Sequence, residues 1–77
     1  WTMDKYKNIA GGSNVLAFEM GVDSITIMFN SGAIYLYDYQ SAGEYHVEQM
    51  KRLAKSGEGL NGYIKQYVDG NYAKKFA

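Results

Sequence analysis

The spacing of apolar residues changes once along the 77-residue chain, and this change limits the folds that are open to it. Up to Tyr39, apolar and aromatic residues alternate with other residues in several short runs, a period typical of β-strands. From Tyr45 onward, apolar residues recur every three or four positions, as they do on one face of a helix. Strands that come first and helices that follow predict a single α+β domain with an antiparallel sheet.

Three strands are expected before this change. Residues 13–20 and 24–29 both alternate and are rich in β-branched and aromatic side chains, with a glycine-containing turn between them. Residues 30–32 match a three-residue hairpin loop in which Gly32 can take a left-handed conformation. A third strand follows over residues 33–39. This order predicts a three-stranded antiparallel meander.

Two helices are expected after the meander, packed on one of its faces. Ser41 and Glu44 have the spacing of a capping box, which predicts a first helix that begins at Ala42. Gly57 is expected to end it. The most regular helical pattern in the chain indicates a second helix that ends near residues 69–70, before a short basic tail; its apolar positions are Leu60, Tyr63, Ile64, Tyr67 and Val68.

A row of tyrosines, Tyr35, Tyr37 and Tyr39, occupies alternate positions of the third strand. Such a row on a sheet either stacks nucleic-acid bases or fills a core. The predicted loop pairs Phe29 with Ala33, which places Tyr35 and Tyr37 on the same face as Phe29 and two isoleucines of the preceding strand. This register favours burial of both rings beneath the helices, with their hydroxyls at the rim. An open stacking platform is the alternative.

The opposite face of the sheet would then carry Met28, Ile34 and Leu36. Apolar patches on an uncovered surface usually mark a contact with a partner. We expect this face to be covered by a second copy of the protein or by residues 1–12. Those residues are predicted to form a loosely ordered leader ahead of a single domain at residues 13–77.

The composition excludes several kinds of chemistry. The chain has no cysteine, which rules out disulfides and thiolate sites, and its single histidine, His46, has no second nitrogen ligand with which to bind a metal. The glycine-rich residues 57–62 lack the Lys and Ser/Thr of a phosphate-binding loop. No apolar run is long enough to cross a membrane. We therefore expect a cytoplasmic, non-enzymatic protein with no cofactor, no metal and no small-molecule substrate.

The formal charge is zero overall but is unevenly spread. Residues 1–38 have a balance of −2, whereas residues 51–77 hold six cations against two carboxylates, a balance of +4. A basic region can bind the phosphates of a nucleic acid, although a solvated helical surface has the same composition. The expected phosphate contacts are Lys51, Arg52, Lys55, Lys65, Lys74 and Lys75, and the tyrosines that could stack on bases are Tyr35, Tyr37, Tyr67 and Tyr72.

Three segments of the chain resemble the KTSC domain. They are residues 13–15 (S-N-V), residues 25–37 (with Y-x-Y at Tyr35 and Tyr37) and residues 54–64 (A-K-S-G-E-G-L-N-G-Y-I). This small module is named for its place at the C-terminus of some lysyl-tRNA synthetases and also occurs as a free-standing protein. The resemblance implies a single KTSC-like domain and, through the association with the synthetase, RNA binding.

The chain also differs from the family pattern in ways that bear on function. It has no proline, whereas the family has Val-Pro at the start of the first helix. Met28, Ile34 and Leu36 replace polar residues that are common on the outer sheet face of the family. We therefore expect one of two functions: a small RNA-binding module or, alternatively, a protein-interaction or homo-oligomerisation module that uses this outer face.

Overall fold

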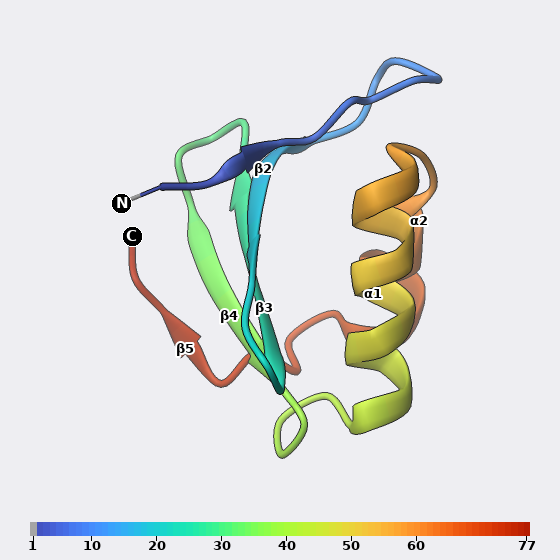
Figure 1. The fold of residues 1–77 in the computed structure, drawn as a ribbon. Coiled ribbons are helices and arrows are strands. Elements are labelled where there is room, and N and C mark those ends of the chain that lie inside the picture. Colours follow the sequence, from blue (N-terminus) through green and yellow to red (C-terminus); the bar gives the residue numbers. More distant parts are fainter. Residues whose placement is uncertain (1) are drawn as a thin grey trace.

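The computed structural model describes residues 2–77, which form a five-stranded antiparallel sheet with helices on one face (Figure 1). The strands lie in the sheet in chain order, each beside the next. The α+β class is confirmed, and the sheet has two more strands than the three predicted. In sequence the elements are β1 (Asp4–Lys5), β2 (Val15–Met20), β3 (Ser24–Phe29), β4 (Ile34–Asp38), α1 (Glu44–Ser56), α2 (Leu60–Tyr63) with its π-helical continuation η1 (Ile64–Val68), and β5 (Lys74–Lys75).

The β3–β4 hairpin has the predicted register. Ile25 lies opposite Tyr37, and the loop closes where the Phe29 N–H donates to the Ala33 carbonyl oxygen at 2.9 Å. Gly32 within this loop has a φ of 93°, a left-handed conformation that glycine adopts without strain. The register therefore turns the tyrosine row towards the helices, as expected.

The core lies between the inner face of the sheet and the helices (Figure 1). In β2 a bulge between Val15 and Ala17 shifts the register of pairing with β3. In a regular strand, residues three positions apart lie on opposite faces. The extra residue at the bulge places both Val15 and Phe18 on the inner face. The buried apolar residues of the core are Tyr6, Val15, Phe18, Ile25, Ile27, Tyr37, Val47, Met50, Ala54, Leu60, Ile64 and Val68.

Helix α1 begins two residues later than predicted, and the capping box predicted for Ser41 and Glu44 is wrong. The N-cap is Gly43, and no side chain caps the helix. Ser41 pairs with Asp38 instead: the Asp38 N–H donates to Ser41 Oγ at 3.0 Å, and the Ser41 N–H donates to Asp38 Oδ1 at 2.8 Å. This reciprocal pair caps a short turn after β4, and Gly43, with a φ of 95°, separates that turn from α1.

The second helix covers the residues expected of it. Leu60, Ile64 and Val68 are buried at intervals of four residues, and the final stretch forms the π-helical turn η1. Asp69 leaves the helical conformation, and Gly70 follows with a φ of 81°. Among the described residues, no helix combines the length and the apolarity needed to cross a membrane.

The first described residues of the chain are part of the domain. This corrects the expectation of a loosely ordered leader over residues 1–12, of which residue 1 lies outside the described residues. β1 pairs with β2, and Tyr6 is only 2% exposed. The Tyr6 hydroxyl accepts a hydrogen bond from the Leu60 N–H at 3.2 Å, at the first residue of α2. Gly57 lies beneath this segment, and a β-carbon added to it would stand 2.6 Å from the Cβ of Lys7. Only glycine fits there.

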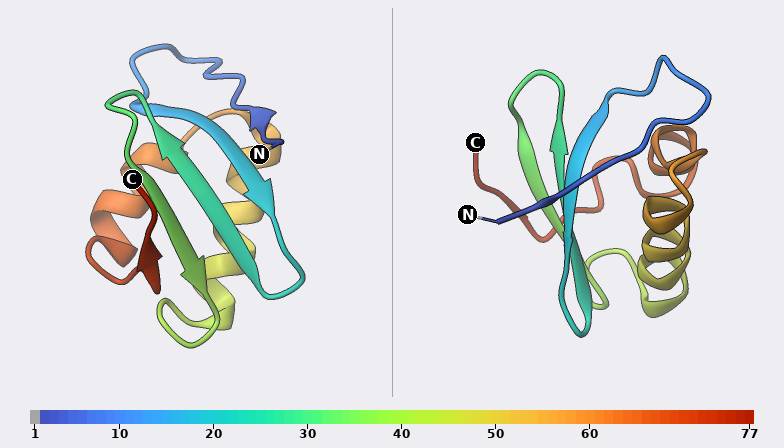
Figure 2. Two further views of the ribbon diagram at one scale, coloured as in Figure 1. Left: turned by 90° about the vertical axis from the view of Figure 1, so that its left-hand side faces the viewer. Right: turned by 45° about the horizontal axis from the view of Figure 1, so that its top comes forward.

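The basic tail also joins the sheet. β5 pairs with β4, where its two residues lie opposite Tyr35 and Leu36 (Figure 2). The Phe76 N–H continues this pairing by donating to the Ile34 carbonyl oxygen at 2.7 Å. The last residues of the chain therefore lie beside the strand that carries the tyrosine row.

Candidate functional site

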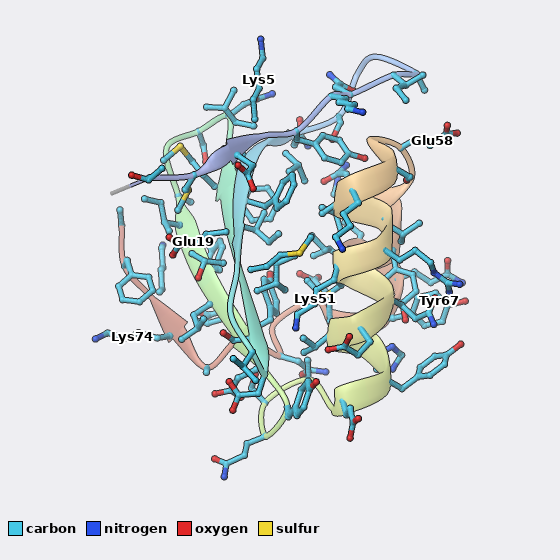
Figure 3. All side chains as sticks on the ribbon, viewed as in Figure 1. Lys5, Glu19, Lys51, Glu58, Tyr67 and Lys74 are labelled. Atoms are coloured by element: carbon cyan, nitrogen blue, oxygen red, sulfur yellow. The ribbon has the colours of Figure 1, made fainter. Side chains whose placement is uncertain are left out.

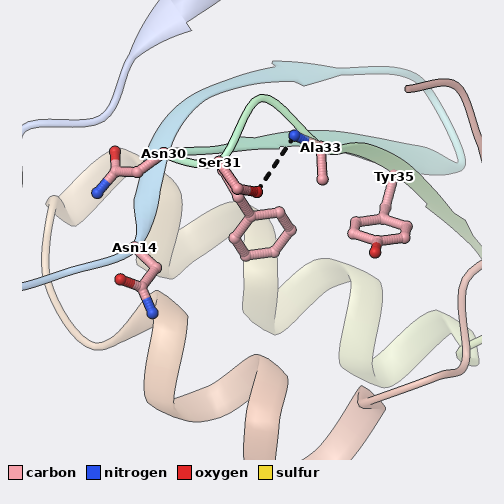
Figure 4. Close-up of a pocket in the computed structure, with 6 residues that line it drawn as sticks. Asn14, Asn30, Ser31, Ala33 and Tyr35 are labelled. Carbon is pink, nitrogen blue, oxygen red and sulfur yellow. Dashed lines mark hydrogen bonds between the residues drawn. The ribbon is translucent and has the colours of Figure 1, made fainter.

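A groove separates the β3–β4 end of the sheet from α2 and η1. It consists of two hollows of about 390 and 210 Å³, and Asn14, Phe29 and Tyr35 line both of them. Figure 4 shows the larger hollow, with the Asn14 and Asn30 side chains and the Tyr35 ring around it. The smaller hollow extends towards η1 and is also lined by Tyr37, Asn61, Ile64, Lys65, Asp69, Gly70 and Tyr72.

Four aromatic rings line this groove: Phe29, Tyr35, Tyr37 and Tyr72, called the groove cluster below. The Tyr35 ring is central, with its centroid 4.6 Å from that of Tyr72 and 5.6 Å from that of Phe29. Tyr37 is buried at 3% exposure, as predicted, whereas Tyr35 is half-buried and Tyr72 is exposed. The predicted stacking residues thus divide: Tyr37 belongs to the core, and Tyr35 and Tyr72 border open space.

Two lysines accompany these rings. The Lys75 Nζ lies 5.6 Å from the centroid of the Tyr35 ring, a position in which the ring attracts the cation. Lys65 lines the smaller hollow. Both side chains are exposed, and neither forms an ion pair within residues 2–77. Their charge is therefore available to an anionic group in the groove.

The Tyr37 phenol is neutral at ordinary pH. Burial raises its pKa to about 12, and the neighbouring Tyr35, Asp69 and Tyr72 groups add to the shift. The protonated hydroxyl can donate a hydrogen bond, whereas the Asp69 carboxylate in the same hollow can only accept one when it is ionised. The smaller hollow thus has a hydrogen-bond donor, the Tyr37 hydroxyl, and an acceptor, the Asp69 carboxylate, near Lys65 and Lys75.

Three asparagines of the groove were missed by the sequence analysis. Asn14 lines both hollows, Asn30 lines the larger and Asn61 the smaller. A carboxamide carries both a donor and an acceptor, which are the groups that read the edges of nucleic-acid bases. One signal could have found two of them, because Asn14 and Asn61 lie in the S-N-V and L-N-G portions of the segments that resemble the KTSC domain.

The cations predicted on α1 do not line the groove. The Lys51 Nζ lies 3.1 Å from Glu48 Oε2 and donates to a backbone carbonyl of the β2–β3 turn at 2.9 Å, so it points at the sheet (Figure 3). The Tyr39 hydroxyl also donates to Glu48, at 2.7 Å. This bond lowers the pKa of Glu48 and raises that of Tyr39 to about 12. Arg52 and Lys55 are exposed on α1, away from both hollows.

The outer face of the sheet carries Met28, Ile34 and Leu36, as the register required. All three are half-buried, and none of the described helices covers this face (Figure 1). Lys74 lies opposite Leu36, and its Nζ is 5.0 Å from the centroid of the Phe76 ring. The sheet therefore separates Lys74 from the groove, and this predicted phosphate contact is not part of the same site (Figure 3).

Tyr67 belongs to a second group of rings, on the helices, formed with Tyr45, His46 and Tyr63 and called the helix cluster below. The His46 ring stacks on Tyr67 with centroids 5.7 Å apart and an angle of 24° between the planes. Its Nδ1 lies 2.6 Å from the Tyr63 hydroxyl, within hydrogen-bonding distance. Among residues 2–77, no three His, Asp or Glu side chains gather as metal ligands would.

Comparison with known proteins gave no match: no family model, no curated protein and no solved structure matches the chain. The resemblance to KTSC domains stays a prediction from the three segments that suggested it. What the groove can bind follows from its own side chains.

Proposed function

We propose that this protein is a small, cytoplasmic, non-enzymatic module that binds single-stranded RNA in the groove. The observation that carries the proposal is the position of Tyr35, a half-buried ring that borders the groove with the Lys75 ammonium group 5.6 Å from its centroid. Proteins bind single-stranded nucleic acids by stacking bases on aromatic side chains and by meeting phosphates with cations. Lys65 and the carboxamides of Asn14, Asn30 and Asn61 also line the groove. The KTSC resemblance implies the same class of ligand, RNA.

A single strand suits the groove better than a duplex does. A duplex holds its bases in the stack and offers mainly its phosphates and grooves to a protein, whereas unpaired bases can turn out and enter a pocket. Binding to a duplex backbone also needs several cations on one surface. Here Lys65 and Lys75 stand at the groove, while Lys51 is paired with Glu48 and Lys74 lies on the outer face.

Matched charge variants test the proposal. The dissociation constant for a short single-stranded RNA is measured for the wild type, for the Lys65→Gln/Lys75→Gln double variant and for the Arg52→Gln/Lys55→Gln double variant, which loses the same charge on α1. We expect weaker binding in the first variant and wild-type binding in the second. Equal losses in both, tighter binding to a duplex of the same sequence, or no binding at low salt would contradict the proposal.

A second candidate function is protein interaction or homo-oligomerisation through the outer sheet face. The observation that favours it is the absence of any described helix over Met28, Ile34 and Leu36, which are only half-buried (Figure 1). A Met28→Lys variant places a charge in this patch. A wild-type dimer that becomes a monomer in the variant, measured by analytical ultracentrifugation, would support this function; identical masses would count against it.

A further inference from the structure

We infer that the groove takes one nucleotide unit of the RNA chain, with its base against Tyr35 in the larger hollow and the phosphates on its 5′ and 3′ sides at Lys65 and Lys75. The inference rests on the proposed function, and it adds a footprint, an orientation and a number of phosphate contacts. It follows from the size of the groove, from the groups that line it and from the charges beside it.

The size of the groove fits one base. At about 390 Å³ the larger hollow lies near the lower end of the range of about 300–1,000 Å³ that is usual for small-molecule sites. Residues of the β3–β4 loop, Asn30 and Ser31, line the larger hollow, whereas Gly70 and Tyr72 line the smaller one. Domains that track a strand have longer binding sites, of about 4–16 nucleotides per OB fold.

The larger hollow has the groups that hold a planar, polar ligand. The Tyr35 and Phe29 rings meet edge to face, with an angle of 72° between their planes, so they present two differently oriented surfaces to a base. Asn14 and Asn30 stand beside them (Figure 4). The Asn30 amide nitrogen donates to the Ser13 carbonyl oxygen at 3.1 Å, which holds that side chain in place.

The charges orient the nucleotide. Lys65 and Lys75 are the cations of the groove, and Asp69 is the carboxylate among the residues that line it. Asp69 repels a phosphate and can accept a hydrogen bond from a ribose hydroxyl. The nucleotide therefore binds with its two flanking phosphates towards the two lysines and its sugar towards Asp69, an orientation in which a 2′-hydroxyl contributes to affinity.

Two phosphate contacts give a specific salt dependence. For single strands, the slope of the logarithm of affinity against the logarithm of salt concentration is about −0.7 for each neutralised phosphate. Two lysines predict a slope of about −1.4. Contacts from all six cations of residues 51–77 would give a slope of about −4. The difference between these slopes is measurable and does not depend on the sequence of the RNA.

The test is a length series run at several salt concentrations. The full chain is titrated with a ribonucleoside monophosphate, and with the dinucleotide, tetranucleotide and octanucleotide of the same base; each carries a 5′-phosphate. We expect affinity to rise from the mononucleotide to the dinucleotide and then to level off, with a slope of about −1.4. Lys65→Gln should reduce the slope by about 0.7, and Arg52→Gln should leave it unchanged.

The outcomes separate this inference from the function on which it rests. Affinity that keeps rising to the octanucleotide, with a slope near −4, would overturn the one-nucleotide footprint and leave RNA binding intact. A mononucleotide that binds as tightly as the dinucleotide would overturn the two-phosphate arrangement and identify a free nucleotide, rather than an RNA chain, as the ligand of the pocket. No binding to any member of the series at low salt would overturn both proposals.

Discussion

The groove cluster and the helix cluster contain the same kinds of side chain in different surroundings. In the groove cluster, Tyr35 borders a hollow of about 390 Å³ and has Lys75 beside its ring. In the helix cluster, the His46 ring lies against Tyr67, and its Nδ1 meets the Tyr63 hydroxyl. No residue of the helix cluster lines either hollow of the groove. Aromatic content alone thus does not mark a binding surface; open volume and available charge beside the rings do.

The largest difference between the clusters should appear in the free energy of unfolding when one of their tyrosines is replaced by alanine. Tyr37 is 3% exposed, whereas Tyr45 of the helix cluster is 69% exposed. Tyr37→Ala should lower the free energy of unfolding by about 3–5 kcal/mol, because it leaves a large cavity in the core. Tyr45→Ala should change it by less than about 0.5 kcal/mol. Urea denaturation of both variants measures this contrast, and similar losses would show that the two clusters are equally buried.

A smaller effect is expected on RNA binding. Tyr35→Leu keeps an apolar side chain but removes the ring, and it should weaken binding by about 1–3 kcal/mol, the usual contribution of one stacked base. Tyr67→Leu makes the same change in the helix cluster and should leave the dissociation constant unchanged. Circular dichroism of both variants confirms that the fold is retained. Equal weakening would place the stacking surface outside the groove.

The hydrogen bond between Tyr63 and His46 in the helix cluster should have a smaller effect still, on the free energy of unfolding. Burial raises the pKa of Tyr63, which keeps its phenol protonated beside His46. Tyr63→Phe removes the hydroxyl and should lower the free energy of unfolding by about 0.5–1.5 kcal/mol, with no change in RNA affinity. Tyr67→Phe is the matched control, since its hydroxyl has no hydrogen bond within residues 2–77. A loss of RNA affinity in Tyr63→Phe would contradict the separation of the clusters.

The smallest expected effect is a pH dependence that belongs to the groove cluster. The pKa of Tyr37 is raised from 10.0 to about 12 in the folded protein. The folded state therefore holds this proton more tightly than the unfolded chain, and the resulting stability is complete below pH 10 and is lost as the pH rises to about 12. Because Tyr37 lines the open smaller hollow, solvent screens the phenolate, and we expect an effect on the order of 0.5 kcal/mol. Tyr37→Phe should remove this part of the alkaline decline in urea denaturation, and an unchanged decline would contradict the assignment.

The hairpin that positions the groove could be predicted because its loop length determines which residues pair. A slip of one residue would send Ile25 and Tyr37 to the outer face, so hydrophobic burial enforces the same register that the loop selects. Three features were not predicted, namely β1, β5 and the bulge in β2, because their local sequence patterns are weaker. β1 and β5 are two residues long, too short to show a period, and backbone hydrogen bonds to their neighbours place them. The bulge near Val15 interrupts the alternation of β2.

The candidate site was predicted in part. Tyr35, Tyr72, Lys65 and Lys75 were expected to bind nucleic acid. The fold brings them together although Lys65, Tyr72 and Lys75 follow the end of β4 by more than twenty residues. The charge pattern could not separate these lysines from those on α1, because the pairing of Lys51 depends on where the helix docks. The asparagines were missed for the same reason: whether a polar side chain lines a pocket depends on where the fold places it.

The hydrogen bond between Tyr6 and Leu60 has a consequence for the order of events during folding. It joins residues 54 positions apart, so the entropy of closing a long loop must be overcome before it forms. The amide at the start of α2 gains this partner only once the first strand has docked. We therefore expect the hairpin to form early and the second helix to consolidate late, in the same kinetic phase as the docking of the first strand.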